Sequence, residues 1–129
     1  MRCIIIESPF RARGPFSAED HAHYARLCMA DSLRRGEAPF ASHLLYTQCL
    51  DDNIPEQREQ GIAAGLVWAR KADGAAVYYD LGVTDGMNRG IRFHRENVVR
   101  VELRRIFSPA IGRSLRIGTL TLTEAENLK

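Results

Sequence analysis

Hydrophobic and polar residues along this chain form short strand-like patterns that are separated by longer helix-like ones. Continuous apolar runs over 3–6 and 75–79 predict strands buried on both faces, as in a parallel sheet. Residues 99–104 alternate between apolar and charged side chains, which predicts a strand near an edge with one solvent-facing side. A weaker strand pattern covers 38–42, where the proline near its beginning is tolerated.

Helix signals lie between these strands. Ser17 with two acidic residues after it predicts the start of a helix that ends near Gly36. Further helices are predicted from Pro55 to about Lys71 and from about Asp85 to Arg95, and residues 43–50 fit a short helix or a packed loop. This order predicts a three-layer, doubly wound α/β domain whose mostly parallel sheet has four to five strands.

The length of 129 residues suits one domain, 1–129, with residues 108–129 as a C-terminal extension. Within this extension, Ser108, Pro109 and Gly112 favour a loop, and residues 117–122 could form a short strand.

The balance of charged residues bears on two classes of partner, nucleic acids and membranes. Eighteen basic and sixteen acidic residues leave a net charge of +2, so no nucleic-acid or membrane partner is expected. The short run Arg104-Arg105 is interpreted as part of a solvated face. The apolar run 3–6 is too short for a signal peptide, and no run approaches the roughly 18 apolar residues of a membrane span, so we expect a cytoplasmic protein.

Three cysteines, Cys3, Cys28 and Cys49, are widely spaced and form no CxxC pair. This spacing is typical of reduced, mostly buried thiols, and it predicts neither a disulfide framework nor a metal site. Gly82 and Gly86 do not form a GxGxxG pattern, and no P-loop lysine follows them, so no cofactor is expected.

Polar residues follow several predicted strands directly: Glu7 and Ser8, then Ser42 and His43, then Asp80. Because the carboxyl ends of parallel strands share one edge, the topology predicts that these residues converge at a ligand crevice. Asp80 could accept ligand hydroxyls or act as a base, or it could cap the turn and the helix that follows. His43 could stack on a ligand, act as a base or simply pack.

The segment from 80 to 90 combines an Asp-x-Gly turn with Gly86-Met87-Asn88-Arg89-Gly90. Together with Ser8-Pro9-Phe10 and the polar end of the second strand, it resembles the nucleoside 2-deoxyribosyltransferase family and related small domains, several of them phage-borne. The similarity covers roughly 3–95. It implies a flavodoxin-like five-stranded sheet, a nucleoside or nucleotide ligand, and a homo-oligomer whose subunits help to close each pocket.

In that family a glutamate at the start of the helix attacks C1′ of the sugar and expels the base. Asn88 occupies this place here, and a neutral amide is a poor nucleophile. Asp80 matches the sugar-binding aspartate of the family, and the segment 8–10 matches the one that contacts the base. The ligand-binding residues implied are Ser8, Pro9, Phe10, Ser42, His43, Asp80, Gly82, Gly86, Met87 and Asn88.

Three hypotheses follow. The domain binds a nucleoside or nucleotide without chemistry, which Asn88 favours. Alternatively, it is an N-glycosidic hydrolase or transferase that uses Asp80, Asp85 or Glu7 as a relocated catalytic carboxylate. In the third, the fold serves as a non-catalytic interaction or structural domain.

Overall fold

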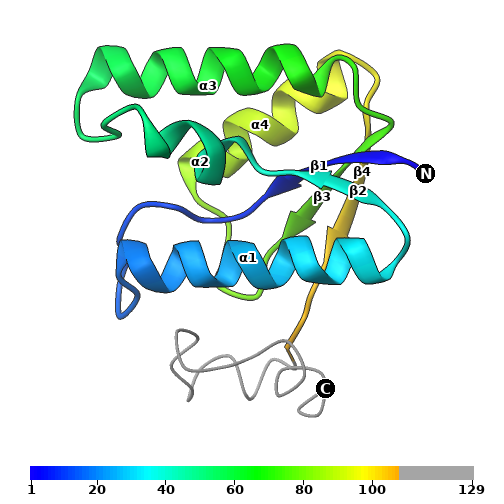
Figure 1. Ribbon diagram of the computed structural model, residues 1–129, viewed down its shortest axis with the longest axis horizontal. Helices are drawn as coiled ribbons and strands as arrows, with labels where there is room; N and C mark the ends of the chain where they lie inside the picture. The colour runs from blue at the N-terminus through cyan, green and yellow to red at the C-terminus, as the bar shows by residue number, and fades with distance from the viewer. Residues whose placement is uncertain (108–129) are drawn as a thin grey trace.

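The computed structural model describes residues 1–107 as a four-stranded parallel sheet with helices on both faces (Figure 1). This architecture confirms the predicted three-layer, doubly wound α/β class. In chain order the elements are β1 (Cys3–Glu7), α1 (Ala18–Arg34), β2 (Ala38–Phe40), α2 (Ser42–Leu45), the 3-10 turn η1 (Tyr46–Gln48), α3 (Pro55–Ala69), β3 (Gly74–Tyr78), α4 (Asp85–Glu96) and β4 (Arg100–Arg104).

The strand order is β2-β1-β3-β4, as in flavodoxin-like sheets. After β1 the chain moves outward to β2 and then returns to pair β3 on the other side of β1. The order therefore reverses between β1 and β3, and a ligand crevice is expected outside the carboxyl ends of these strands. The candidate strand at 117–122 lies outside the described residues.

The two faces of β1 pack against different helices, because successive side chains of a strand point in opposite directions. Ile4 and Ile6 join the core cluster that contains Tyr24 and Leu27 of α1. Ile5 joins the smaller cluster with Ala69 of α3. In Figure 1, α1 lies on one side of the sheet while α3 and α4 lie on the other. Glu7, two residues after Ile5, consequently points toward α3 and α4.

Side-chain caps fix the starts of the two helices that follow β1 and β3. The Ser17 hydroxyl accepts a hydrogen bond from the Asp20 backbone N–H at 3.1 Å, which confirms the predicted start of α1. Thr84 accepts one from the Met87 backbone N–H at 3.2 Å and begins α4. No helix described over residues 1–107 is long and apolar enough to cross a membrane.

The last residues of β4 depart from the expected solvent-facing pattern. Arg104 is only 5% exposed, whereas Leu103 is 65% exposed. The Arg104 guanidinium donates to both carboxylate oxygens of Glu37 at 2.8 Å and to Glu102 at 2.7 Å. A buried arginine is tolerated when it is paired in this way. The Arg104 end of this side of β4 therefore belongs to the interior beside α1, whereas Arg100 at its start is exposed. The solvated-face interpretation of Arg104 is wrong.

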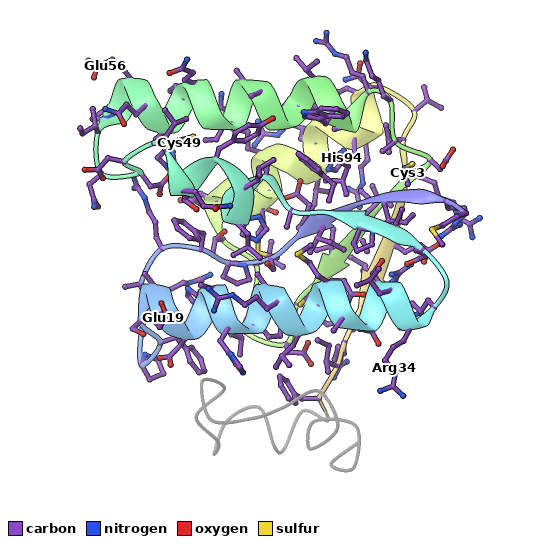
Figure 2. All side chains as sticks on the ribbon, viewed as in Figure 1. Cys3, Glu19, Arg34, Cys49, Glu56 and His94 are labelled. Carbon is purple, nitrogen blue, oxygen red and sulfur yellow. The ribbon has the colours of Figure 1, made fainter. Side chains whose placement is uncertain are left out.

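The cysteines also differ in part from expectation. Cys28 is buried in α1, and all three thiols are free. Cys3 and Cys49 are exposed, and Figure 2 places them at separate positions of the fold. Cys3 is the first residue of β1 and Cys49 directly follows η1, so both exposed thiols lie at the ends of elements.

Candidate functional site

A cavity of about 570 Å³ lies beyond the carboxyl end of β1, on the side of the sheet that α3 and α4 cover. Its walls come from the end of β1 and the loop 10–13, the start of α2, one face of α3 and the first turns of α4. Ile62 and Leu66 of α3 supply apolar wall. The cavity therefore occupies the position where doubly wound sheets bind ligands.

Most of the residues singled out in the sequence meet in this cavity. These residues fall into two groups, those that line the cavity and those that do not. The lining group contains Glu7, Ser8, Phe10, Ser42, His43, Asp85, Gly86 and Met87. The structure places Pro9, Asp80, Gly82 and Asn88 outside the lining.

Asp80 lies instead beneath the segment that follows β4. Its carboxylate accepts a hydrogen bond from the Tyr24 hydroxyl of α1. It also accepts the backbone N–H groups of Ile106, at 3.0 Å, and Phe107, at 2.8 Å. Because these donors come from α1 and from the chain after β4, Asp80 holds the two segments together. The idea that Asp80 caps the following helix is wrong, since Thr84 performs that role.

Asn88 lies on an exposed face of α4. The inward face of the helix carries the buried residues Met87, Gly90 and His94. This spacing of three and seven residues is typical of one helical face, and Asn88 is one position away from it. The motif therefore brings its neighbours to the cavity but not Asn88 itself.

At the least exposed end of the cavity, Glu7 pairs with His94. The two atoms His94 Nε2 and Glu7 Oε1 are 2.9 Å apart. Since an ionised carboxylate only accepts, Nε2 carries the hydrogen and donates it. His94 is fully buried, and Figure 2 shows it among the side chains between α3 and the sheet. Among residues 1–107, its Nδ1 is the buried side-chain polar atom that has no hydrogen-bond partner.

Gly90 makes this pairing possible. A Cβ on Gly90 would lie 2.5 Å from Glu7 Oε1, far inside van der Waals contact. The carboxylate thus rests directly against the backbone of α4. Sequence reasoning missed His94, although its helical spacing from Met87 and Gly90 was a usable signal.

Ser8 and His43 form a second polar pair in the cavity. Ser8 Oγ lies 2.8 Å from His43 Nε2, and the ring of Phe10 meets the His43 ring edge-on at 6.2 Å between centroids. Burial lowers the pKa of His43 to about 4, although the charge of Asp52 opposes the shift. At neutral pH the imidazole is therefore uncharged, and its Nε2 can accept the serine hydroxyl proton.

Arginines were the main omission of the sequence analysis. Arg11, Arg13, Arg58 and Arg89 all line the cavity. Arg89 donates two hydrogen bonds to the Glu59 carboxylate, from Nη1 at 2.8 Å and from Nη2 at 2.9 Å. These side chains come from a loop and two helices, so their convergence has no signature in local sequence. Within residues 1–107, no three histidine, cysteine or acidic residues gather into a group that could hold a metal ion.

Fold and site together define a doubly wound α/β domain with a cavity of ligand size at its switch point. Residues 2–104 match the family model of the domain of unknown function DUF7768, so the chain belongs to this family. The comparisons with curated proteins and with solved structures gave no match.

Proposed function

We propose that this protein binds a nucleoside or nucleotide in the cavity beyond β1. The observation that supports the proposal most is the convergence of polar and aromatic side chains in one cavity of about 570 Å³. Cavities of roughly 300–1,000 Å³ hold small organic ligands. The choice of nucleosides rests on the resemblance of segments 8–10 and 80–90 to nucleoside 2-deoxyribosyltransferases.

The environment near Phe10 suits a planar heterocyclic base. Phe10 and His43 offer ring surfaces, and Ile62 with Leu66 offers apolar contact. The Ser8 hydroxyl and the uncharged His43 ring can each donate or accept a hydrogen bond to a base edge. Apolar surface with a few fixed polar groups is typical of sites that recognise a small molecule.

The proposal is tested by titrating the protein with nucleosides and their 5′-phosphates in a calorimeter and by thermal shift. We expect at least one base to bind, and we expect His43→Gln to weaken that binding by about fivefold or more. His23→Gln, on α1 and outside the cavity lining, serves as the matched control. If no nucleoside or nucleotide binds, the proposal fails.

A second candidate function is cleavage or transfer at an N-glycosidic bond, and the Glu7–His94 pair favours it. The cavity contains two of the three carboxylates considered from sequence, Glu7 and Asp85. Glu7 is held by a fully buried histidine, while Asp85 is exposed at the start of α4. A carboxylate fixed in this way beside a sugar carbon could act as a nucleophile or a base.

Chromatography after incubation with nucleosides and nucleotides separates the two functions. Release of free base by the wild type, together with its loss in Glu7→Gln and its persistence in Asp85→Asn, would support catalysis by Glu7. Binding without any base release supports the first candidate alone.

A further inference from the structure

Arg58 has hydrogen-bonding capacity that the protein does not use. Its side chain is 28% exposed, and its nearest carboxylate oxygen, Oδ2 of Asp52, lies 3.8 Å from Nε. Within residues 1–107 the guanidinium donates no hydrogen bond, although it has five N–H groups. These N–H groups stand at the wall of the cavity, where an acceptor group of a ligand can pair with them.

Arg58 lies over the first turn of α4. Its Nη2 is 3.6 Å from the position that a Cβ would take on Gly86. On another side of the same segment, Arg13 Nη1 donates to the Val83 carbonyl at 3.0 Å. Two guanidinium groups, one from α3 and one from the loop before α1, therefore flank residues 82–86.

The charges around this segment do not cancel. Arg11 also lines the cavity and pairs with Asp52, with 3.2 Å between Nε and Oδ2. On this side of the cavity three arginines, Arg11, Arg13 and Arg58, outnumber two carboxylates, Asp52 and Asp85. The third carboxylate of the lining, Glu7, lies against Gly90 and His94, and Arg89 is paired with Glu59. The start of α4 adds the positive end of its helix dipole.

The same cavity is also lined by a buried histidine with a ring nitrogen that is unpaired within the described residues. His94 lines it, is fully buried, and has Nδ1 without a hydrogen-bond partner among the described residues. Because Nε2 donates to Glu7, Nδ1 is left as an acceptor, for which a donor group of a ligand would be a suitable partner. This observation about His94 does not depend on the arginines or on their charges.

We propose that the cavity is a phosphate-binding site, in which Arg58 and Arg13 hold a phosphate group of the ligand against the first turn of α4. The guanidinium fork matches the geometry of phosphate oxygens, and the N-terminal N–H groups of a helix complete the cradle. The inference rests on the proposed function, and it specifies that the ligand is a nucleotide rather than a nucleoside.

The charge arrangement also orients the ligand. Glu7 lies at the less exposed end of the cavity, and its carboxylate repels a phosphate. The arginines lie at the more exposed side. The phosphate group therefore binds near Arg58, and the uncharged part of the nucleotide extends toward Glu7 and Phe10.

The experiment compares a nucleoside, its 5′-monophosphate and inorganic phosphate by calorimetry with three proteins. These are the wild type, Arg58→Gln and the control Arg26→Gln, which replaces an exposed arginine of α1 outside the cavity. We expect the wild type to bind the monophosphate about tenfold or more tightly than the nucleoside. Arg58→Gln should remove most of that advantage and change nucleoside affinity by less than about threefold.

Circular dichroism and the urea midpoint establish that Arg58→Gln is folded, and Arg13→Gln provides a second variant with the same expected result. Raising the salt concentration should weaken the binding of the monophosphate more than that of the nucleoside, because exposed charges are screened. Equal wild-type affinity for nucleoside and monophosphate overturns the phosphate site and leaves the proposed function standing. Binding of inorganic phosphate without nucleosides or nucleotides supports the phosphate site and overturns the proposed function. Binding of none of the three overturns both.

Discussion

His94 and Glu7 are 87 positions apart in sequence, yet His94 Nε2 donates to Glu7 Oε1 at 2.9 Å. The contact joins the third turn of α4 to the last residue of β1. It places a carboxylate and a fully buried imidazole at one end of the candidate site. Its geometry depends on a glycine one turn earlier in α4, where the helix backbone itself forms the wall behind the carboxylate.

Replacing Gly90 with alanine tests this dependence. The new Cβ would lie 2.5 Å from Glu7 Oε1, so the carboxylate must move away from His94. We expect the free energy of unfolding to fall by about 1–2 kcal/mol, because the buried histidine loses its acceptor. Urea unfolding measures the change. Gly86→Ala is the control, since its Cβ would meet the nearest atom at an ordinary 3.6 Å.

The double variant Glu7→Ala, Gly90→Ala isolates the steric cause. Without the Glu7 carboxylate, the added methyl group has room, and Gly90→Ala should stabilise the helix by about 0.5–1 kcal/mol relative to Glu7→Ala alone. If Gly90→Ala lowers stability equally in both backgrounds, the clash with Glu7 is not the reason.

His43 should make stability depend on pH in mildly acidic solution. Burial lowers its pKa from 6.5 to about 4 in the folded protein, so between these values the unfolded chain binds more protons. The free energy of unfolding should therefore be highest above pH 6.5 and fall by about 1–3 kcal/mol toward pH 4. Urea titrations of the wild type and His43→Gln measure this fall, which the variant should lack. An NMR titration midpoint near 6.5 for His43 would contradict the expectation.

Asp80 is expected to support the fold rather than the ligand. Asp80→Asn replaces an oxygen that accepts backbone N–H groups with an amide, and one of these donors loses its partner. We expect a loss of about 1–3 kcal/mol in the free energy of unfolding, with nucleotide affinity changed less than about twofold. Tyr24→Phe should weaken the same junction by a smaller amount. A strong loss of nucleotide binding at unchanged stability would return Asp80 to the binding site.

The convergence of Ser8 and His43 could be predicted from sequence because it follows from strand pairing. Ile5 and Phe40 are register partners in β1 and β2, and each polar residue comes three positions after its partner. Their side chains consequently lie 2.8 Å apart although 35 positions separate them. The strand ends and the parallel topology were sufficient to place this part of the cavity.

The positions of the strand ends did not indicate on which face of the sheet each of the following polar residues lies. Glu7 follows Ile5 by two positions and points to the α3 side, whereas Asp80 follows Tyr78, whose hydroxyl contacts Asp31 of α1. Glu7 ends β1 and Asp80 comes two positions after the end of β3, yet the two side chains lie on opposite sides of the sheet. Arg58 was missed for a related reason, because only the packing of α3 beside α4 brings it to Gly86.

Glu37 should control stability at more acidic pH, and it is the sharpest test of the buried network beside α1. Arg104 holds the pKa of Glu37 at about 2, aided by Ser32 and Arg2, although burial opposes the shift. Because this folded-state pKa lies below the ordinary 4.5, the contribution of Glu37 to stability is fully present above pH 4.5 and is lost as the pH falls toward 2.

At pH 7, Glu37→Gln should cost about 3–5 kcal/mol, since it leaves the Arg104 charge buried with less compensation. Urea unfolding at roughly pH 7, 4 and 3 measures the difference in free energy of unfolding between the wild type and Glu37→Gln. This difference should become smaller as the pH falls. Glu59→Gln, which breaks an exposed ion pair with Arg89, should change the free energy of unfolding far less than Glu37→Gln does. If the curves of the wild type and Glu37→Gln run parallel across this range, the Glu37–Arg104 pair is not the source of the acid sensitivity.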